Sequence, residues 1–210
     1  MPGFELTDIP TAEIDRAEAE IQPLVDTLRE VVDATIRTCV GADQLQLAQQ
    51  ELESALARLQ ADQFDGPAGV KFNSEGRSWN WGNTVVGQRN AMAPPLRITH
   101  VRPGLAHAKA DLGAVYEGPP GLVHGGVTAL LLDHLMGETA SAGHTRVTLT
   151  GTLSLRYVKG ARLGPVRLDA HIDREDGRKV YVLARLSDAE GVCTEADGVF
   201  IVPRWFAESQ

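Results

Sequence analysis

Cysteines are scarce in this sequence, and their placement argues against two common ways of stabilising a small fold. Only Cys39 and Cys193 occur among the 210 residues, and no C-x-x-C pair is present. A disulfide framework or a structural zinc site needs more cysteines at short spacings. We therefore expect two reduced thiols, which are typical of a cytoplasmic protein.

Long apolar runs are also missing. The longest run surrounds Leu131 and has about half of the roughly 20 residues that a bilayer-spanning helix requires. The opening segment MPGFELTDIPTAEIDRAEAE has no basic region followed by an apolar stretch, as a secretory signal would. The sequence thus predicts no membrane span and favours the cytoplasm.

Positive charge is in deficit. Lysine and arginine total 20, aspartate and glutamate total 28, and the formal net charge is −8. A nucleic-acid surface usually needs a basic patch that neutralises phosphates. We expect no nucleic-acid partner, although a local basic patch for a small phosphorylated ligand remains open.

Residues 1–63 carry the pattern of a helical hairpin. From Thr11 to about Thr38, apolar residues recur three and four positions apart, with a kink expected at Pro23. A second helix is expected to begin at a cap provided by Asp43 and to stop before Gly66. The apolar stripes are Ile14, Ala17, Ile21, Leu24, Leu28 and Val31 in the first helix, and Leu45, Ala48, Leu52, Ala55 and Leu59 in the second.

Residues 64–95 read as an irregular connector, because they are rich in Gly, Asn and Pro and show no sustained period. We expect Trp79 and Trp81 to pack against another part of the chain. From residue 96 to residue 206 the pattern changes to short segments of period two, which are typical of strands. These predicted strands cover 96–101, 105–113, 147–157, 164–173, 179–188 and 192–203.

Alternation is clearest at 147–157. Val147, Leu149, Leu153, Leu155 and Tyr157 are expected on one face, and Thr148, Thr150, Thr152, Ser154 and Arg156 on the other. The stretch after His124 is instead a helix with apolar residues on all sides, which must be surrounded. The sequence therefore predicts an α+β domain over 96–206, with a long helix wrapped by a curved antiparallel sheet of about six strands.

Asp133 lies in the middle of this apolar helix. Burying an ionised carboxylate without partners costs several kcal/mol or shifts its pKa. Asp133 is therefore our first candidate for a catalytic group. The alternative is a buried aspartate that hydrogen-bonds to a backbone group.

Two glycines, Gly125 and Gly126, open the same helix. Unpaired backbone N–H groups and the helix dipole favour an anion at this place, and glycine allows a ligand to approach the backbone closely. Such donors stabilise the negative charge that develops on a carbonyl oxygen during attack by water. The alternative is an ordinary turn before a helix.

Several motifs occur together in the second half of the chain. GPPGLVHGG leads into the helix, and Asp133 follows His124 by nine residues. Thr150 precedes Tyr157 by seven residues, and the segments EDGRKVY and EADGVFI follow. In this combination, residues 90–206 resemble the hotdog-fold acyl-CoA thioesterases of the phenylacetate-pathway (PaaI-like) branch. The chain departs from some relatives at Pro119–Gly121, where they place an asparagine.

The resemblance implies hydrolysis of an acyl-CoA thioester without a metal or an organic cofactor. It assigns the oxyanion donor to the Gly125 N–H, with Gly126 beside the substrate, and it gives His124 the task of holding the loop and the thioester. Asp133 is expected to be the general base or the nucleophile, and Thr150 to orient the attacking water. The pocket is expected at the interface of a homodimer, which can pair into a dimer of dimers.

The substrate itself is described only in outline by the sequence. Arg178 and Lys179, at a predicted hairpin tip, can offer charge-assisted donors to the phosphates of coenzyme A, and a solvated turn is the alternative. The many apolar residues favour a fatty acyl chain over an aromatic acid. This points to fatty acid metabolism.

Rival functions have weaker support. A hotdog hydratase places a His five residues after an Asp, whereas His134 follows Asp133 directly. His124, His134 and His144 are ten residues apart, which does not place them on one helical face, and no H-E-x-x-H or G-x-S-x-G motif occurs. The remaining alternative is a non-catalytic acyl-CoA-binding sensor or scaffold on the same fold.

Overall fold

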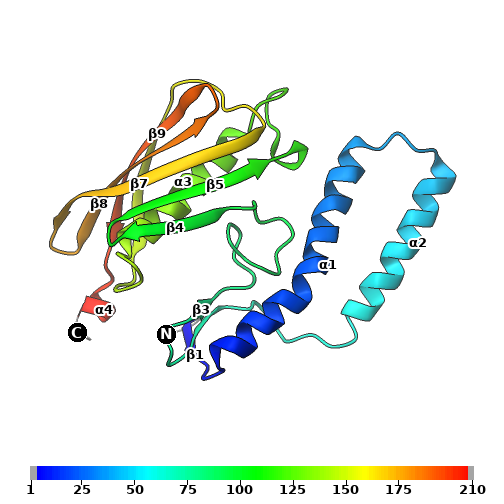
Figure 1. Ribbon diagram of the computed structural model, residues 1–210, viewed down its shortest axis with the longest axis horizontal. Helices are drawn as coiled ribbons and strands as arrows, with labels where there is room; N and C mark the ends of the chain where they lie inside the picture. Colours follow the sequence, from blue (N-terminus) through cyan, green and yellow to red (C-terminus); the bar gives the residue numbers. More distant parts are fainter. Residues whose placement is uncertain (1–3, 208–210) are drawn as a thin grey trace. The chain divides into compact units, whose positions relative to one another are not determined.

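The second half of the chain forms a six-stranded antiparallel sheet that curves around one helix, α3 (Figure 1). The computed structural model describes residues 4–207. The strand order is β4-β5-β7-β8-β9-β6. The elements are β4 (Arg97–Arg102), β5 (Leu105–Leu112), α3 (Gly125–Ala140), β6 (Leu149–Tyr157), β7 (Gly164–Asp176), β8 (Lys179–Asp188) and β9 (Gly191–Ile201), with the short helices η1 (Ala114–Tyr116) and α4 (Arg204–Ala207). The predicted hotdog architecture is confirmed.

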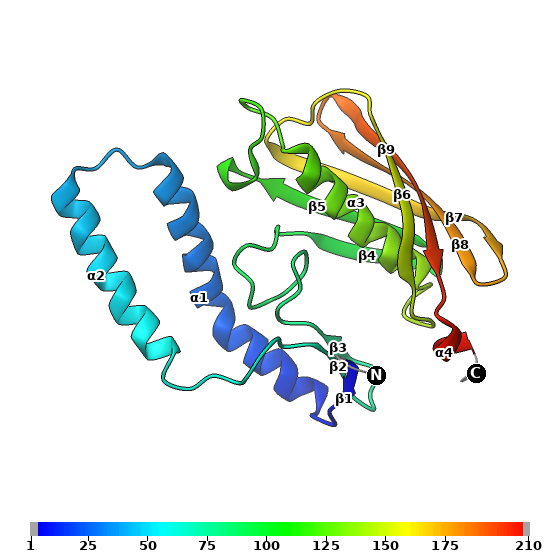
Figure 2. The same ribbon diagram turned by 180° about the vertical axis from the view of Figure 1, so that it is seen from behind.

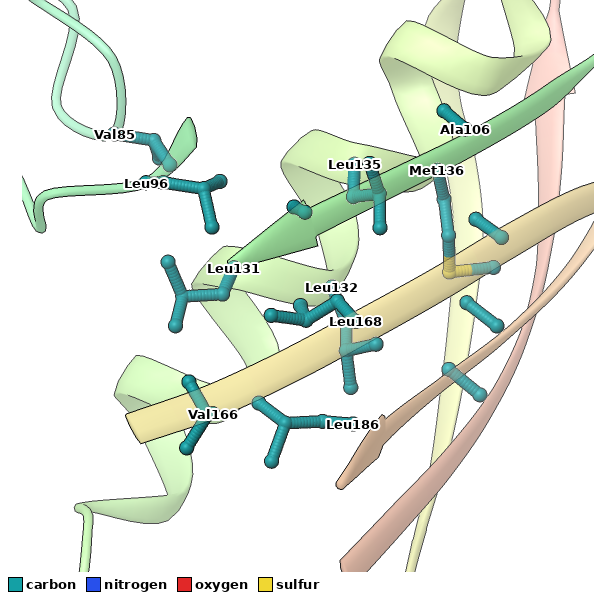
Figure 3. Close-up of a cluster of buried hydrophobic side chains, with 14 of the residues drawn as sticks. Val85, Leu96, Ala106, Leu131, Leu132, Leu135, Met136, Val166, Leu168 and Leu186 are labelled. Atoms are coloured by element: carbon teal, nitrogen blue, oxygen red, sulfur yellow. The ribbon is translucent and has the colours of Figure 1, made fainter. Parts of the chain in front are cut away.

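One side of α3 and the facing side of the sheet make the core (Figure 3). Leu131, Leu132, Leu135 and Met136 have no exposed surface, and they pack with the equally buried Leu168 of β7. Burying a leucine side chain stabilises a fold by about 1.5–3 kcal/mol, so these residues anchor the helix to the sheet. This packing sets which side of α3 faces the sheet.

The face assignment predicted for β6 is wrong at its beginning. The pairing with β9 shifts by one residue between Thr150 and Thr152, so Gly151 forms a β-bulge. Thr150 pairs with the buried Phe200 and therefore lies on the side that faces α3, whereas Leu149 is exposed. A bulge reverses the alternation of the strand, which a period-two reading of the sequence does not foresee.

Glycine is favoured at this bulge by the lack of space. A Cβ atom added at Gly151 would lie 3.0 Å from the side chain of Ile201 and 3.2 Å from the Val199 carbonyl oxygen. The neighbouring strand β9 would have to yield to any larger residue. Gly151 thus helps to set the face on which Thr150 lies.

The chain separates into two compact units. The first contains the residues up to Asn83 and Gly87–Met92, and the second contains Thr84–Val86 and the chain from Ala93 onward. The first unit holds helices α1 (Thr11–Arg37) and α2 (Ala42–Leu59) and a small sheet of β1 (Phe4–Leu6), β2 (Val70–Phe72) and β3 (Ser78–Trp79) (Figure 2). No helix among residues 4–207 is both long and apolar enough to cross a membrane.

The first unit corrects two expectations. Residues 64–95 contain β2 and β3, whose pairing partly replaces the irregular connector that the composition predicted. Asp43 lies in the first turn of α2 and does not cap it, because the helix begins at Ala42 after Gly41. An acidic residue in that turn still interacts favourably with the helix dipole.

The tryptophans of the first unit do pack, as expected. Trp79 is 5% exposed, and the Trp81 indole N–H donates to Glu18 of α1 at 3.1 Å. The Arg89 guanidinium lies 3.5 Å from the centroid of the Trp81 ring, a cation–π contact. Arg77 also donates to Glu18, at 2.7 Å. These contacts connect α1 to the β2–β3 turn and to the segment that follows the small sheet.

Candidate active site

His124 is the N-cap residue of α3 and closes the loop before the helix. Its Nδ1 accepts a hydrogen bond from the Gly126 N–H at 2.9 Å, which assigns the neutral ring's proton to Nε2. A Cβ at position 126 would lie 3.1 Å from that nitrogen, so glycine lets the ring fold back over the amide. The Gly126 N–H, expected beside the substrate, is therefore used within the loop.

The Gly125 N–H, unlike that of Gly126, makes no hydrogen bond within the loop. It donates to no acceptor among residues 4–207, as expected for the first residue of a helix. The Gly125 carbonyl oxygen accepts a 2.9 Å hydrogen bond from the Tyr157 hydroxyl of β6. Tyr157 thus fixes the peptide at the start of α3. Tyr157 was noted in the sequence only for its spacing from Thr150, and this contact with Gly125 was not foreseen.

Asp133 and Thr150, which the resemblance names as site residues, are in contact in the structure. The Thr150 hydroxyl donates to Asp133 Oδ1 at 2.9 Å. Asp133 lies on the side of α3 away from the core and is half-buried. The expected burial of this carboxylate is therefore only partly met within one chain. A carboxylate with one hydrogen-bonded oxygen and access to solvent can receive a proton from water.

Gly125 and Asp133 lie far apart within one chain. Eight residues separate them on the same helix, which corresponds to roughly 12 Å at a rise of about 1.5 Å per residue. A hydrogen-bond donor and a base that act on one carbonyl group must both lie within about 3 Å of the reacting atoms. One chain therefore does not supply both groups to the same substrate.

Arg178 and Lys179 lie at the turn between β7 and β8, where the sequence placed them. The Arg178 guanidinium donates to the Val202 carbonyl oxygen at 3.0 Å, so part of its donor capacity is used near the C-terminal end of β9. The other guanidinium N–H groups project from the same fork. This geometry is compatible both with phosphate binding and with an ordinary turn exposed to solvent.

A cavity of about 760 Å³ in the second unit is lined by residues of β5–β9, among them His107, Asp169 and Arg185. Its lining includes none of the proposed catalytic residues. The presence of a cavity therefore does not identify the position of the active site. The helix N-terminus and the Asp133–Thr150 pair are the stronger indication, because they combine a donor and a hydrogen-bonded carboxylate.

Comparison with protein families finds a match to the sequence model of the thioesterase superfamily over residues 120–195, which contain Gly125, Asp133 and Thr150. Among curated proteins, the acyl-coenzyme A thioesterase THEM5 of Homo sapiens is 33% identical over 96 residues, which are 42% of this chain and 37% of that protein. The acyl-coenzyme A thioesterase THEM4 of Xenopus laevis is 33% identical over 95 residues, which are 42% of this chain and 41% of that protein. The matched segment thus spans about two-fifths of these relatives.

Among solved structures, the crystal structure of a thioesterase superfamily protein matches with a TM-score of 0.76 and 30% sequence identity. The match covers 95% of this chain and 98% of that chain, so it includes the region of the N-terminal helices.

Proposed function

The chain belongs to the thioesterase superfamily, and on this basis we propose that it hydrolyses acyl-CoA thioesters. In the overall reaction the carbon–sulfur bond breaks, water supplies the new oxygen of the acid and the proton of the thiol, and the products are a free carboxylic acid and coenzyme A. The observation that carries the proposal is the 2.9 Å hydrogen bond between Thr150 and Asp133, on the same helix that offers the Gly125 N–H.

In this mechanism Asp133 has one of two roles. As a general base it takes a proton from water that Thr150 orients, and as a nucleophile it forms a transient anhydride with the acyl group. A single turnover in water labelled with heavy oxygen separates the roles. Label in the peptide containing Asp133 would identify a nucleophile whose anhydride is opened at the Asp133 carbonyl, whereas a base leaves all of the label in the acid product. If the label is found only in the acid, trapping of the anhydride with hydroxylamine distinguishes the two roles.

The Gly125 N–H serves as the oxyanion donor, and His124 holds the loop in place. Because Gly125 and Asp133 lie roughly 12 Å apart on one helix, we place the Gly125 of one subunit opposite Asp133 and Thr150 of a second. The half-buried side of α3, which carries Asp133 and His134, is the surface available for that subunit. The functional unit is then a homodimer, alone or as half of a tetramer.

Complementation between two inactive variants tests the shared site. Asp133→Asn removes the base, and Gly125→Pro removes the N–H while keeping a residue suited to the first helical position. His124, with φ −59° and ψ 131°, already has the conformation preferred before proline. A Cβ at position 125 would lie 3.4 Å from the Tyr157 hydroxyl, an ordinary contact.

Mixing the two variants under conditions of subunit exchange should restore about a quarter of the parent activity, because half of the dimers are mixed and each of these has one intact site. An active monomer by light scattering, or no restoration despite proven exchange, would contradict the shared site.

The substrate proposal is a fatty acyl-CoA, supported by the apolar character of the domain, with Arg178 and Lys179 near the phosphates of coenzyme A. The cytoplasm remains the expected location, from the two free thiols, of which Cys39 is exposed and Cys193 is buried. The alternative function is an acyl-CoA sensor or scaffold. The exposed leucines of α2 favour it, because they offer an interaction surface.

Thiol release from short, medium, long and aromatic acyl-CoAs decides between enzyme and sensor. We expect Asp133→Asn to lower turnover by about 10²–10⁴-fold and to keep acyl-CoA binding. Asp43→Asn, which removes the same charge from exposed α2, is the matched control and should retain full activity. Tight acyl-CoA binding by the parent without any thiol release would instead identify a binding protein.

A further inference from the structure

Three potential metal ligands converge near the end of α3, although the sequence separates them widely. His100 lies on the edge strand β4, Glu138 on α3, and His144 in the connection from α3 to β6. The His144 Nε2 lies 2.7 Å from Glu138 Oε2, and the His100 Nε2 lies 3.4 Å from the same oxygen. One ligand atom from each residue lies within 4.8 Å of the others.

Two imidazole nitrogens and one carboxylate oxygen are a ligand set that zinc uses in proteins, with water in the fourth position. Bonds of about 2.0–2.1 Å in a tetrahedral arrangement place neighbouring ligand atoms about 3.4 Å apart. The distance from His100 to Glu138 already has this value. His144 must withdraw by less than ~1 Å, and its side chain is 55% exposed, which leaves it room to move.

We propose that His100, Glu138 and His144 bind one divalent transition-metal ion, with zinc as the best match. The site shares no residue with the Asp133–Thr150 pair, and its existence does not depend on thioester hydrolysis. A bound ion would join β4, the end of α3 and the connection to β6. It would therefore stabilise the segment that leads to Thr150.

The connection that carries His144 is well anchored. The Arg146 Nε–H donates to the Ala140 carbonyl oxygen at 2.7 Å, and the guanidinium forms a bidentate pair with Glu175 at 2.7 and 2.9 Å. His144 itself has a φ of 63°, in the left-handed region that a non-glycine residue rarely adopts. The loop thus holds this imidazole against Glu138 in an uncommon backbone conformation.

The surroundings of Glu138 favour its charged form. Burial by itself would raise the pKa of Glu138, but the hydrogen bond from His144 and the nearby His144, His134 and His100 hold the pKa below its ordinary value. The same hydrogen bond raises the pKa of His144. Burial lowers the pKa of His134, one turn earlier on α3, so this third imidazole favours its neutral form. Because a transition-metal ion binds neutral imidazole and ionised carboxylate, binding should strengthen as the pH rises.

The test uses the full chain without a polyhistidine tag, stripped with a chelator and returned to chelator-free buffer. Zinc chloride is titrated by calorimetry, and cobalt chloride is followed by its visible absorption. We expect one ion per chain, an intense cobalt spectrum typical of low coordination number, and a higher melting temperature with zinc. Each of His100→Ala and His144→Ala should weaken binding by about 100-fold or more, since even changes around a metal site cost about 10–100-fold.

Two further variants make the result specific. Glu138→Gln keeps the shape of the side chain and should also lose binding, which guards against misfolding of an alanine variant. His171→Ala removes an exposed histidine from β7 and should bind zinc as the parent does. The proposal is overturned if the parent binds no zinc or cobalt, or if His100→Ala and His144→Ala bind as tightly as His171→Ala. Neither result would bear on thioester hydrolysis, which is measured separately.

Discussion

Helices α2 and α3 are both rich in leucine, yet they use their leucines in opposite ways. In α3, Leu131, Leu132 and Leu135 have no exposed surface, whereas in α2 each of the five leucines is between 43% and 52% exposed. The sheet supplies a facing apolar surface for α3, and no residue of α2 is buried among those the structure describes. Leucine content alone therefore does not make a core, because the free energy comes from the surface that is removed from water.

The largest expected effect comes from making the same change in both helices. Leu132→Ala should lower the free energy of unfolding by about 2–5 kcal/mol, because it leaves a cavity in a closed core. Leu52→Ala, at a position 43% exposed, should change it by less than about 0.5 kcal/mol. Urea unfolding at several protein concentrations provides the measurement. A large loss of unfolding free energy in Leu52→Ala would contradict this difference between the two helices. It would show that another surface covers α2 in solution.

Asp188 extends the comparison to charged groups. Burial would raise its pKa, but Lys159 Nζ at 2.8 Å and the backbone N–H groups of Arg162 and Glu190 lower the pKa of Asp188 far below 3.8. A lowered folded-state pKa gives stability that is fully present above 3.8 and is lost as the pH falls through the folded value. Asp188→Asn should therefore cost about 1–3 kcal/mol near neutral pH, and less in acid.

Asp8, in the first unit, is the matched control for Asp188. Its hydrogen bonds from Ser74 lower its pKa, but Asp8 is exposed to water, which can replace these bonds. Asp8→Asn should therefore have a smaller effect than Asp188→Asn at neutral pH. Unfolding curves near pH 7 and near pH 3 give the comparison for both variants. An Asp188 effect that stays constant across this range would contradict the proposed linkage.

The smallest expected effect concerns two hydroxyl-to-carbonyl hydrogen bonds. Tyr157 donates to Gly125 between strand and helix, and Thr27 donates to Pro23 within α1, both at 2.9 Å. Tyr157→Phe should cost about 0.5–1.5 kcal/mol and slow thiol release, because the Gly125 peptide loses its support. Thr27→Val should leave both quantities nearly unchanged, since its bond joins two residues one turn apart in the same helix and fixes no contact between elements. If Tyr157→Phe and Thr27→Val changed stability and thiol release equally, Tyr157 would have no specific role in supporting the Gly125 peptide.

Local patterns in the sequence were sufficient for much of the fold, whereas the candidate site residues came mainly from a family resemblance. Period-two segments located all six strands of the large sheet, and the apolar helix located α3 between β5 and β6. The family resemblance named Asp133 and Thr150; their side chains do meet, and their catalytic roles stay a prediction. The three-residue strands β1 and β2 were missed, because such short segments carry too little periodic signal.

What the sequence determined by itself is the part that depends on neighbours along the chain: helix and strand periods, the apolar character of α3, and the glycines at its start. Only the tertiary structure showed the features that depend on strand register and on contacts between distant segments. The bulge at Gly151 turned Thr150 toward α3, and folding brought His100, Glu138 and His144 together across 44 residues of sequence. The physical reason is that periodicity records only which side of an element is apolar, whereas pairing between distant segments depends on the packing of the whole domain.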